Sequence, residues 1–166
     1  TGLLPEYGVR DVSIAGYPEG HPDISDAALW EAITDKSASL AEQGLTTTII
    51  TQFAFDPDPV LAWIGAVRER GIDDLVRVGT PGPAGVKRLI AFATRFGIGA
   101  NAMIVRKYGF SLTNLMGTAG PEKFVAELGE RLAADPASGD VALHFYTFGG
   151  LPATAAWVRS HGGEAS

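Results

Sequence analysis

The chain has 166 residues, a net charge of −6 and a pI of about 5.0, a balance that makes nucleic acid and anionic membranes poor partners. Apolar residues make up 46% of the chain and charged residues only 19%, which supports a folded core and argues against disorder. The absence of cysteine excludes disulfides, Cys-ligated zinc and thiol nucleophiles. No apolar run reaches the roughly 18 residues that a membrane helix needs, so we expect a cytoplasmic chain that is one domain or part of one.

Short apolar strands alternate with longer helices along the chain, which predicts an α/β fold. Ser25 and Asp26 are good N-caps for the first long helix, and Gly44 supplies its stop. Asp58-Pro59 is expected to cap and open the next helix. Strands are predicted at residues 12–16, 46–51, 75–79 and 141–146, and helices over about 26–44, 58–71, 86–96, 101–108, 121–132 and 152–160.

Strand–helix alternation with right-handed crossovers predicts a parallel sheet, and the near-continuous apolar strands indicate that both of its faces are covered. Two architectures are compatible with it: a small doubly-wound sheet, and part of a (β/α)8 TIM-type barrel, which needs about 250 residues when complete. Ligands bind at the carboxyl edge of the strands in either case, and the placement of the polar loops at that edge favours the barrel. Loops rich in Gly, Pro and polar residues follow the strands at residues 16–22, 51–59, 79–85 and 147–152.

The first of these loops combines an aromatic, an acidic and an imidazole side chain within five residues, namely Tyr17, Glu19 and His21. Such a set can supply an aromatic wall, an acceptor and a titratable donor to a ligand. The alternative is a rigid loop bounded by prolines, in which the histidine caps a backbone carbonyl. The next loop begins with Gln52, whose amide can read a heteroaromatic ring because it donates and accepts side by side. A hydrogen bond to a neighbouring loop is the alternative for this side chain.

Two glycine-containing loops, at residues 80–85 and 117–121, each precede a predicted helix. Backbone N–H groups there can hold a phosphate, although simple turns explain both loops better. Phe92 lies at the edge of its helix's apolar stripe and could stack on a ligand ring or pack in the core. His144 and Tyr146 share one side of the last strand, where His144 could also be a core histidine.

Patterns for common catalytic and metal sites are missing: there is no Ser-His-Asp elbow, no HExxH and no DxDxDG. We therefore expect no metal site. The remaining residues indicate a binding rim for an aromatic, phosphorylated cofactor, without an obvious acid–base pair.

Three of these motifs together resemble the methylenetetrahydrofolate reductase family. They are AGYPEGHP at residues 15–22, ITQF at 50–53 followed by Phe55-Asp56, and HFYT at 144–147. Their order and spacing are similar to the second half of that family, and the similarity covers roughly residues 8–150. The resemblance implies that residues 1–166 form a single domain, the C-terminal half of the barrel with its strands five to eight.

The resemblance also implies an activity. In that family the barrel carries FAD, NAD(P)H reduces the flavin, and the flavin interconverts 5,10-methylene-tetrahydrofolate and 5-methyl-tetrahydrofolate in one-carbon metabolism. The family's proton-donating Glu and the charged groups beside the flavin lie on earlier strands, so no catalytic residue is expected in this half. The residues implied in FAD binding are Ala15, Tyr17, His21 and Lys36, and those implied in substrate binding are Gln52, Arg88, Phe92 and Tyr146.

One segment departs from the family. Where the family usually continues its last motif as YTLNR, this chain has Tyr146-Thr147-Phe148-Gly149-Gly150, so the Asn and Arg are missing.

Two other functions stay open. The chain could be a truncated, non-catalytic half-barrel that forms homo-oligomers or is complemented by the missing half, because a half-barrel has two open parallel edges. It could also be an unrelated TIM-barrel lyase or aldolase. No Schiff-base lysine on a strand supports the aldolase, since all the lysines are predicted to be helical: Lys36, Lys87, Lys107 and Lys123.

Overall fold

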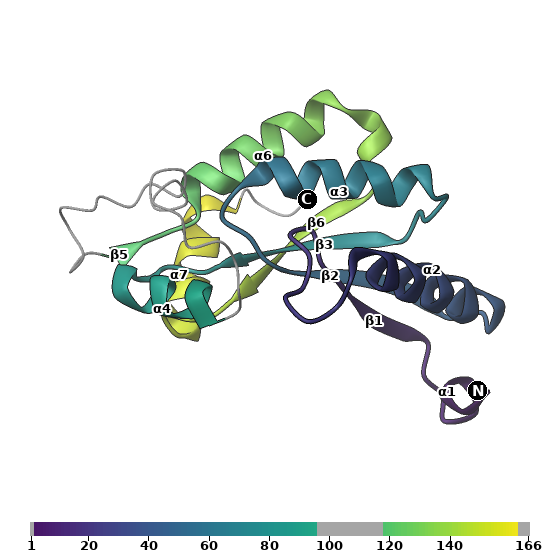
Figure 1. Ribbon diagram of the computed structural model, residues 1–166. Helices are drawn as coiled ribbons and strands as arrows, with labels where there is room; N and C mark the ends of the chain where they lie inside the picture. The colour runs from purple at the N-terminus through teal and green to yellow at the C-terminus, as the bar shows by residue number, and fades with distance from the viewer. Residues whose placement is uncertain (1, 96–117, 163–166) are drawn as a thin grey trace. The chain divides into compact units, whose positions relative to one another are not determined.

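The computed structural model describes residues 2–95 and 118–162 (Figure 1). The helix expected at residues 101–108 lies outside these ranges, as does Lys107. In the described part of the chain, no helix is both long and apolar enough to cross a membrane.

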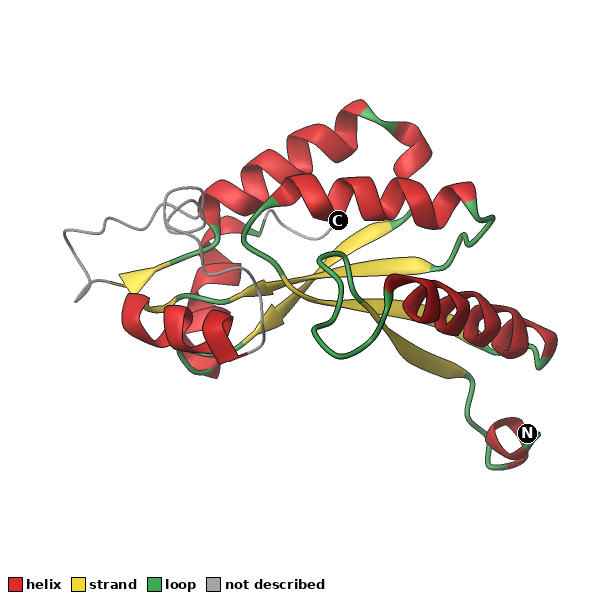
Figure 2. Ribbon diagram, viewed as in Figure 1, coloured by secondary structure: helices red, strands yellow, loops and turns green. Residues whose placement is uncertain are grey.

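Four parallel strands form the main sheet, in the order β1-β2-β3-β6 (Figure 2). They are β1 (Asp11–Gly16), β2 (Thr46–Phe53), β3 (Leu75–Pro81) and β6 (Val141–Tyr146). The α/β fold class and all four predicted strands are confirmed, and the last strand has the predicted bounds. The spatial order of the strands follows the chain order without a reversal.

The helices also follow the prediction, with one shifted start. Ser25 caps the first long helix, and its hydroxyl accepts a hydrogen bond from the Ala28 amide. The next helix begins at Pro57 instead of after Asp58, so the expectation for Asp58-Pro59 was wrong. Either proline suits a first helical turn, where its missing N–H costs nothing. The long helices are α2 (Asp26–Glu42), α3 (Pro57–Glu69), α4 (Val86–Arg95), α6 (Glu122–Ala134) and α7 (Leu151–His161).

Several short elements are additions to the prediction, because they are too short to show a hydrophobic period. They are α1 (Leu3–Glu6), the 3-10 turn η1 (Pro136–Ser138), and the paired strands β4 (Ala84–Gly85) and β5 (Thr118–Ala119).

Contacts divide the chain into two compact units, each described here by itself. Unit 1 comprises Thr1–Gln52, Asp58–Val78 and Leu132–His144, and unit 2 comprises Phe53–Pro57, Gly79–Arg131 and Phe145–Ser166.

Burial alternates along β1 and β2 in unit 1, so this part of the sheet has one covered and one open face. Thr47 and Ile49 of β2 are buried, whereas Thr48 and Ile50 between them are only half-buried. α2 and α3 lie on the covered side (Figure 1), where Trp63 of α3 packs near Ile49. One face of β1 and β2 therefore lacks the full cover that was expected for both faces. The core of unit 1 consists of Ile33, Leu40, Leu45, Ile49, Val60, Trp63, Ile64, Val67, Ile72, Val76 and Val78.

A single guanidinium ties the amino-terminal ends of the strands together in unit 1. Arg68, in the last turn of α3, donates from Nη1 to the carbonyls of Ile72 (2.8 Å) and Asp74 (2.9 Å), directly before β3. Its Nε donates to the Ser138 carbonyl at 2.9 Å and its Nη2 to the Asp140 carbonyl at 3.2 Å, directly before β6. One side chain thus satisfies carbonyls from two connections that are far apart in the sequence.

In unit 2, two glycines follow β6 and let the backbone pass close to another loop. A Cβ on Gly149 would collide with the backbone carbonyl of Pro83 and come within 2.9 Å of the Ala84 Cα. Gly150 has a φ of +100° and forms the N-cap of α7. Gly149 and Gly150, which stand where the family that the sequence resembles has Asn and Arg, are therefore required by the local backbone geometry.

We predict that Arg68→Ala lowers the free energy of unfolding by about 3 kcal/mol, because hydrogen bonds from a charged donor to four carbonyls are lost together. Denaturant titration followed by circular dichroism measures the loss.

Arg70→Ala is the matched control. Its guanidinium lies 3.9 Å from the Trp30 ring centroid, an exposed cation–π contact worth about 0.5–1 kcal/mol. Equal losses in the two variants would contradict the role given to Arg68.

Candidate functional site

The loop after β1 is a tight, hydrogen-bonded turn that fixes Tyr17 and His21 side by side. The Gly20 amide donates to the Tyr17 carbonyl at 3.1 Å, and the two rings meet edge to face with centroids 5.6 Å apart. The Asp23 amide donates to His21 Nδ1 at 3.2 Å, so Nδ1 carries no proton in this arrangement. In the neutral ring the proton then resides on Nε2, which makes Nε2–H the donor that the loop can offer to a ligand. His21 accepts from an amide here and does not cap a carbonyl.

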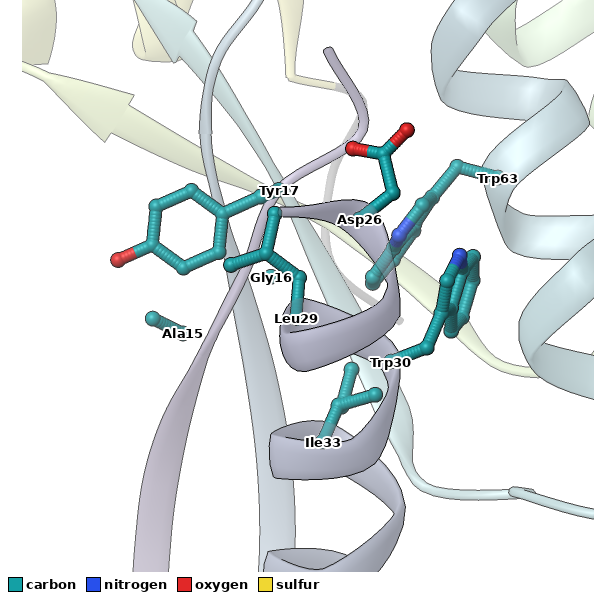
Figure 3. A pocket seen from close by; sticks show the side chains of 8 residues that line it. All are labelled: Ala15, Gly16, Tyr17, Asp26, Leu29, Trp30, Ile33 and Trp63. Atoms are coloured by element: carbon teal, nitrogen blue, oxygen red, sulfur yellow. The ribbon is translucent and has the colours of Figure 1, made fainter. Parts of the chain in front are cut away.

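Close packing at the end of β1 leaves no room for a side chain at Gly16. A Cβ there would lie 2.6 Å from Trp63 Cη2 and 2.9 Å from Ile49 Cγ2. Trp63 in turn stacks on Trp30 of α2, with ring centroids 5.9 Å apart and planes inclined by 23°. Figure 3 shows the two indole rings nearly parallel, with the Tyr17 ring pointing away from them.

Two hollows adjoin this packing, and both belong to unit 1. The first has a volume of about 30 Å³, enough for roughly one water molecule, and is lined by Gly16, Tyr17 and Trp30 among others (Figure 3). The second is a groove of about 500 Å³ lined by Tyr17 and both indoles, within the usual size range of ligand sites. Glu19 and Asp26 also line this groove, and none of its described lining residues is a cation.

Gln52 lies near Ala15 and Tyr17, because β1 and β2 pair in parallel. Ala15 pairs with Ile50 and Gly16 with Thr51, so Gln52 stands one position beyond the end of β1, where Tyr17 follows. Ala15, Ile50 and Gln52 share the open face of the sheet, since alternate residues of a strand point to the same side. The structure therefore brings Ala15, Tyr17, His21 and Gln52 to the carboxyl ends of two adjacent strands.

Lys36 does not join this group. It lines a different groove, of about 310 Å³, with Val12 and Ile14 of β1 and with Asp35, Ser39 and Leu40 of α2. Lys36 is ten residues after the start of α2, so at 1.5 Å per residue it lies about 15 Å down the helix from Asp26. Its assignment to the FAD phosphates or ribose stays a prediction.

The remaining substrate candidates belong to unit 2. Tyr146 contacts Phe53 edge to face at 5.7 Å and stacks on Phe148 at 5.9 Å. Arg88, exposed in the first turn of α4, donates from Nη1 to the Phe148 carbonyl at 2.8 Å. Phe92 follows one turn later in α4, and its side chain lies outside the described part of the structure. Arg88 and Tyr146 therefore share Phe148 as a neighbour.

The two glycine-containing loops are engaged within the protein. Ala84–Gly85 pairs in antiparallel fashion with Thr118–Ala119, which uses backbone groups that an anion would need. The Glu122 carboxylate lies against Gly120, so the amino end of α6 already has a negative group beside it. Glu122 Oε1 also accepts from Trp157 Nε1 at 2.7 Å. These contacts favour turns over phosphate cradles.

The residues at the end of β1 fit a flavin in part. The Nε2–H of His21 and the half-exposed Tyr17 ring suit the polar edge and the flat face of an isoalloxazine. The carboxylates of Glu19 and Asp26 on the neighbouring groove disfavour a pyrophosphate there. No group of three or more His, Cys, Asp or Glu that could hold a metal ion occurs among residues 2–95 and 118–162.

Sequence reasoning missed the paired indoles of Trp30 and Trp63. A signal for them existed in Gly16, since a glycine at the end of a strand often marks the close approach of a large neighbour. No protein-family model matches the chain.

We predict that Gly16→Ala destabilises the protein by about 1–3 kcal/mol, because the added methyl group must displace Trp63 or Ile49. Thermal unfolding monitored by tryptophan fluorescence measures the effect.

Gly65→Ala serves as its control. Gly65 lies within α3 with open space around it, so alanine there should stabilise the helix by about 0.4–1 kcal/mol. A neutral Gly16→Ala variant would show that the packing at the end of β1 tolerates a side chain.

Proposed function

We propose that the chain forms the second half of a flavin-dependent (β/α)8 barrel that interconverts methylene- and methyl-tetrahydrofolate with NAD(P)H as the reductant. The observation that carries the proposal is the placement of Tyr17, His21 and Gln52, the motif residues that resemble the reductase family. They stand at the carboxyl ends of neighbouring parallel strands, which is where barrel enzymes bind their ligands.

The strand order supports the barrel over a doubly-wound sheet. Right-handed crossovers that always step to the next strand in the same direction put every helix on one face. A doubly-wound sheet reverses direction once, which creates its switch point and its second helical layer. The order β1-β2-β3-β6 has no such reversal, and β2 has one buried and one half-buried face.

In this proposal His21 donates from Nε2 to a polar edge of the bound flavin, and the Asp23 amide keeps the imidazole in the tautomer that can donate. Tyr17 supplies an aromatic contact beside it and orients the imidazole through their edge-to-face packing. Gly16 allows the strand end to pack against Trp63, which positions the loop.

Gln52 binds the folate pterin or the nicotinamide amide in turn, because its amide offers a donor and an acceptor side by side. In unit 2, Tyr146 and Arg88 are proposed to bind substrate through their ring and guanidinium, and Phe92 is proposed to stack on the folate. When bound, FAD supplies the hydride transfer itself. In this proposal the described residues supply binding and orientation, and the proton donor lies on another part of the barrel.

The aldolase alternative gains no support from the described strands. None of them contains a lysine, and Lys36, Lys87 and Lys123 all lie on helices as predicted. A Schiff base at the barrel mouth needs a strand lysine in a pocket.

We predict that purified full-length protein containing this chain carries FAD, and that residues 1–166 alone bind FAD weakly or not at all. Absorbance spectra of the two purified samples, with flavin titrated into the second, test this. A colourless full-length protein that takes up no FAD would overturn the proposed function.

We predict further that Gln52→Ala in the full-length protein lowers turnover with folate and with nicotinamide by at least about tenfold while FAD stays bound, because the lost amide reads the substrates. His21→Ala is the comparison, and it should weaken FAD retention first. Unchanged turnover of Gln52→Ala with both substrates would remove Gln52 from the site.

A further inference from the structure

The groove of about 500 Å³ in unit 1 lies between the loop after β1, the start of α2 and one side of α3. Small residues of α3 leave its space, because Pro59, Ala62 and Ala66 follow one another on one helix face at intervals of three and four residues. Among its described lining residues, only Tyr17 is also a proposed flavin or folate contact. The groove is therefore a second candidate site, apart from the open face of the sheet.

The groove is negatively charged, and so is the region around it. Glu19 and Asp26 line it, and none of its described lining residues is a cation. Residues 11–67 contain nine acidic residues and a single basic one, Lys36, whereas the whole chain has 19 acidic and 13 basic residues. Lys36 lines a different groove, ten residues after the start of α2. A field of this sign attracts cations and repels phosphates.

The Asp26 carboxylate is the group best placed to hold a cation. An acidic residue in the first turn of α2 is expected from the helix dipole alone, but Asp26 also lines both this groove and the adjoining hollow of about 30 Å³. Within residues 2–95 and 118–162, no hydrogen bond or ion pair occupies this carboxylate. Gly20 leaves space beside it, since a Cβ there would lie 3.3 Å from Asp26 Oδ1. Figure 3 shows the carboxylate on the same side as the two indole rings, opposite the Tyr17 ring.

The paired indoles of Trp30 and Trp63 give the groove an apolar wall. Arg70, which is not among the described lining residues, already covers the Trp30 ring with its guanidinium at 3.9 Å from the centroid. The positive group of a ligand is therefore left to the carboxylates. Its apolar part is left to the indoles and to the small residues of α3.

We propose that this groove binds a small aliphatic primary amine, with its ammonium group beside Asp26 and its alkyl chain along α3. The adjoining hollow has room for roughly one water molecule, which is close to the size of a primary ammonium group and too small for a quaternary one. An ammonium group has three donors, and an ionised carboxylate accepts with both oxygens. Because about 500 Å³ can hold a whole small molecule, we infer a free amine as the ligand. The proposal does not depend on flavin chemistry.

Calorimetric titration of the purified full-length protein tests the proposal with three probes that share a pentyl chain. Pentylamine should bind with a Kd of about 1 mM or below. Pentyltrimethylammonium should bind at least about tenfold more weakly, because its head group exceeds the hollow, and the uncharged 1-pentanol should bind more weakly still. No binding of pentylamine at about 10 mM, or equal affinity for either of the other probes, would overturn the proposal.

Asp26→Asn should weaken pentylamine binding at least about tenfold, because it removes the charge and keeps the shape of the side chain. Asp35→Asn is the matched control, since it removes the same charge from the same helix about 14 Å further along and outside the groove. That distance exceeds the Debye length of about 8 Å at physiological salt, so the control should bind nearly as the parent protein does. Equal losses in the two variants would contradict the role of Asp26.

A second pair of variants tests the groove by its volume. Ala62→Leu should abolish pentylamine binding, because the larger side chain fills the groove from α3. Gly65→Leu adds a side chain to the same helix where a Cβ meets open space, and it should leave binding unchanged. Circular dichroism should show the same folded spectrum for all variants. Full binding by Ala62→Leu would overturn the proposal.

One further probe separates a free amine from a lysine side chain of a partner protein. Nα-acetyl-lysinamide carries the same primary ammonium group on an alkyl chain, with peptide groups attached to its other end. We expect it to bind more weakly than pentylamine, because the peptide groups must leave water to enter the groove. Tighter binding of Nα-acetyl-lysinamide would overturn the assignment to a free amine and would indicate a protein partner.

Discussion

The four hydrogen bonds of Arg68 are the constraint on which unit 1 depends. The side chain leaves the end of α3 and satisfies carbonyls directly before β3 and β6, so it sets where both strands enter the sheet. Two parallel strands have no direct turn between them to define their relative position, and a shared donor supplies that definition. Because these contacts gather at the amino-terminal ends, the loops at the carboxyl ends are left to carry binding residues such as Tyr17 and Gln52, a division typical of α/β proteins.

Much of the fold could be predicted from the sequence, because in the main elements the apolar pattern and the capping or β-branched residues indicate the same secondary structure. The β-branched run from Thr46 made the second strand recognisable, and the hydroxyl of Ser25 marked the start of α2. The start of α3 could not be predicted, since Pro57 and Pro59 suit a first helical turn equally well. The open face could not be predicted either. Periodicity shows which residues alternate, but it does not show whether a second layer exists to cover them.

For the candidate site, sequence reasoning identified the loop after β1 and the amide that ends β2, because Pro, Gly and strand ends are local signals. It could not supply the geometry of His21, whose tautomer depends on an amide two residues away. Nor could it separate Lys36 from Tyr17, since their distance follows from the length of α2 and its packing against β1. The glycines at 149 and 150, met first as a departure from a family pattern, have a backbone reason of their own in the approach of Pro83.

The distribution of the three tryptophans has a spectroscopic consequence. Trp30 and Trp63 stack on each other within unit 1, while Trp157 in unit 2 stacks on His161 with ring centroids 4.5 Å apart. Neighbouring indoles couple their strong electronic transitions, whereas an indole against an imidazole does not produce such an exciton couplet. The far-ultraviolet exciton couplet of the indole pair therefore reports on unit 1, and the fluorescence of a Trp30→Phe, Trp63→Phe protein would report on unit 2. The tryptophans therefore give unit 1 and unit 2 a separate spectroscopic probe each.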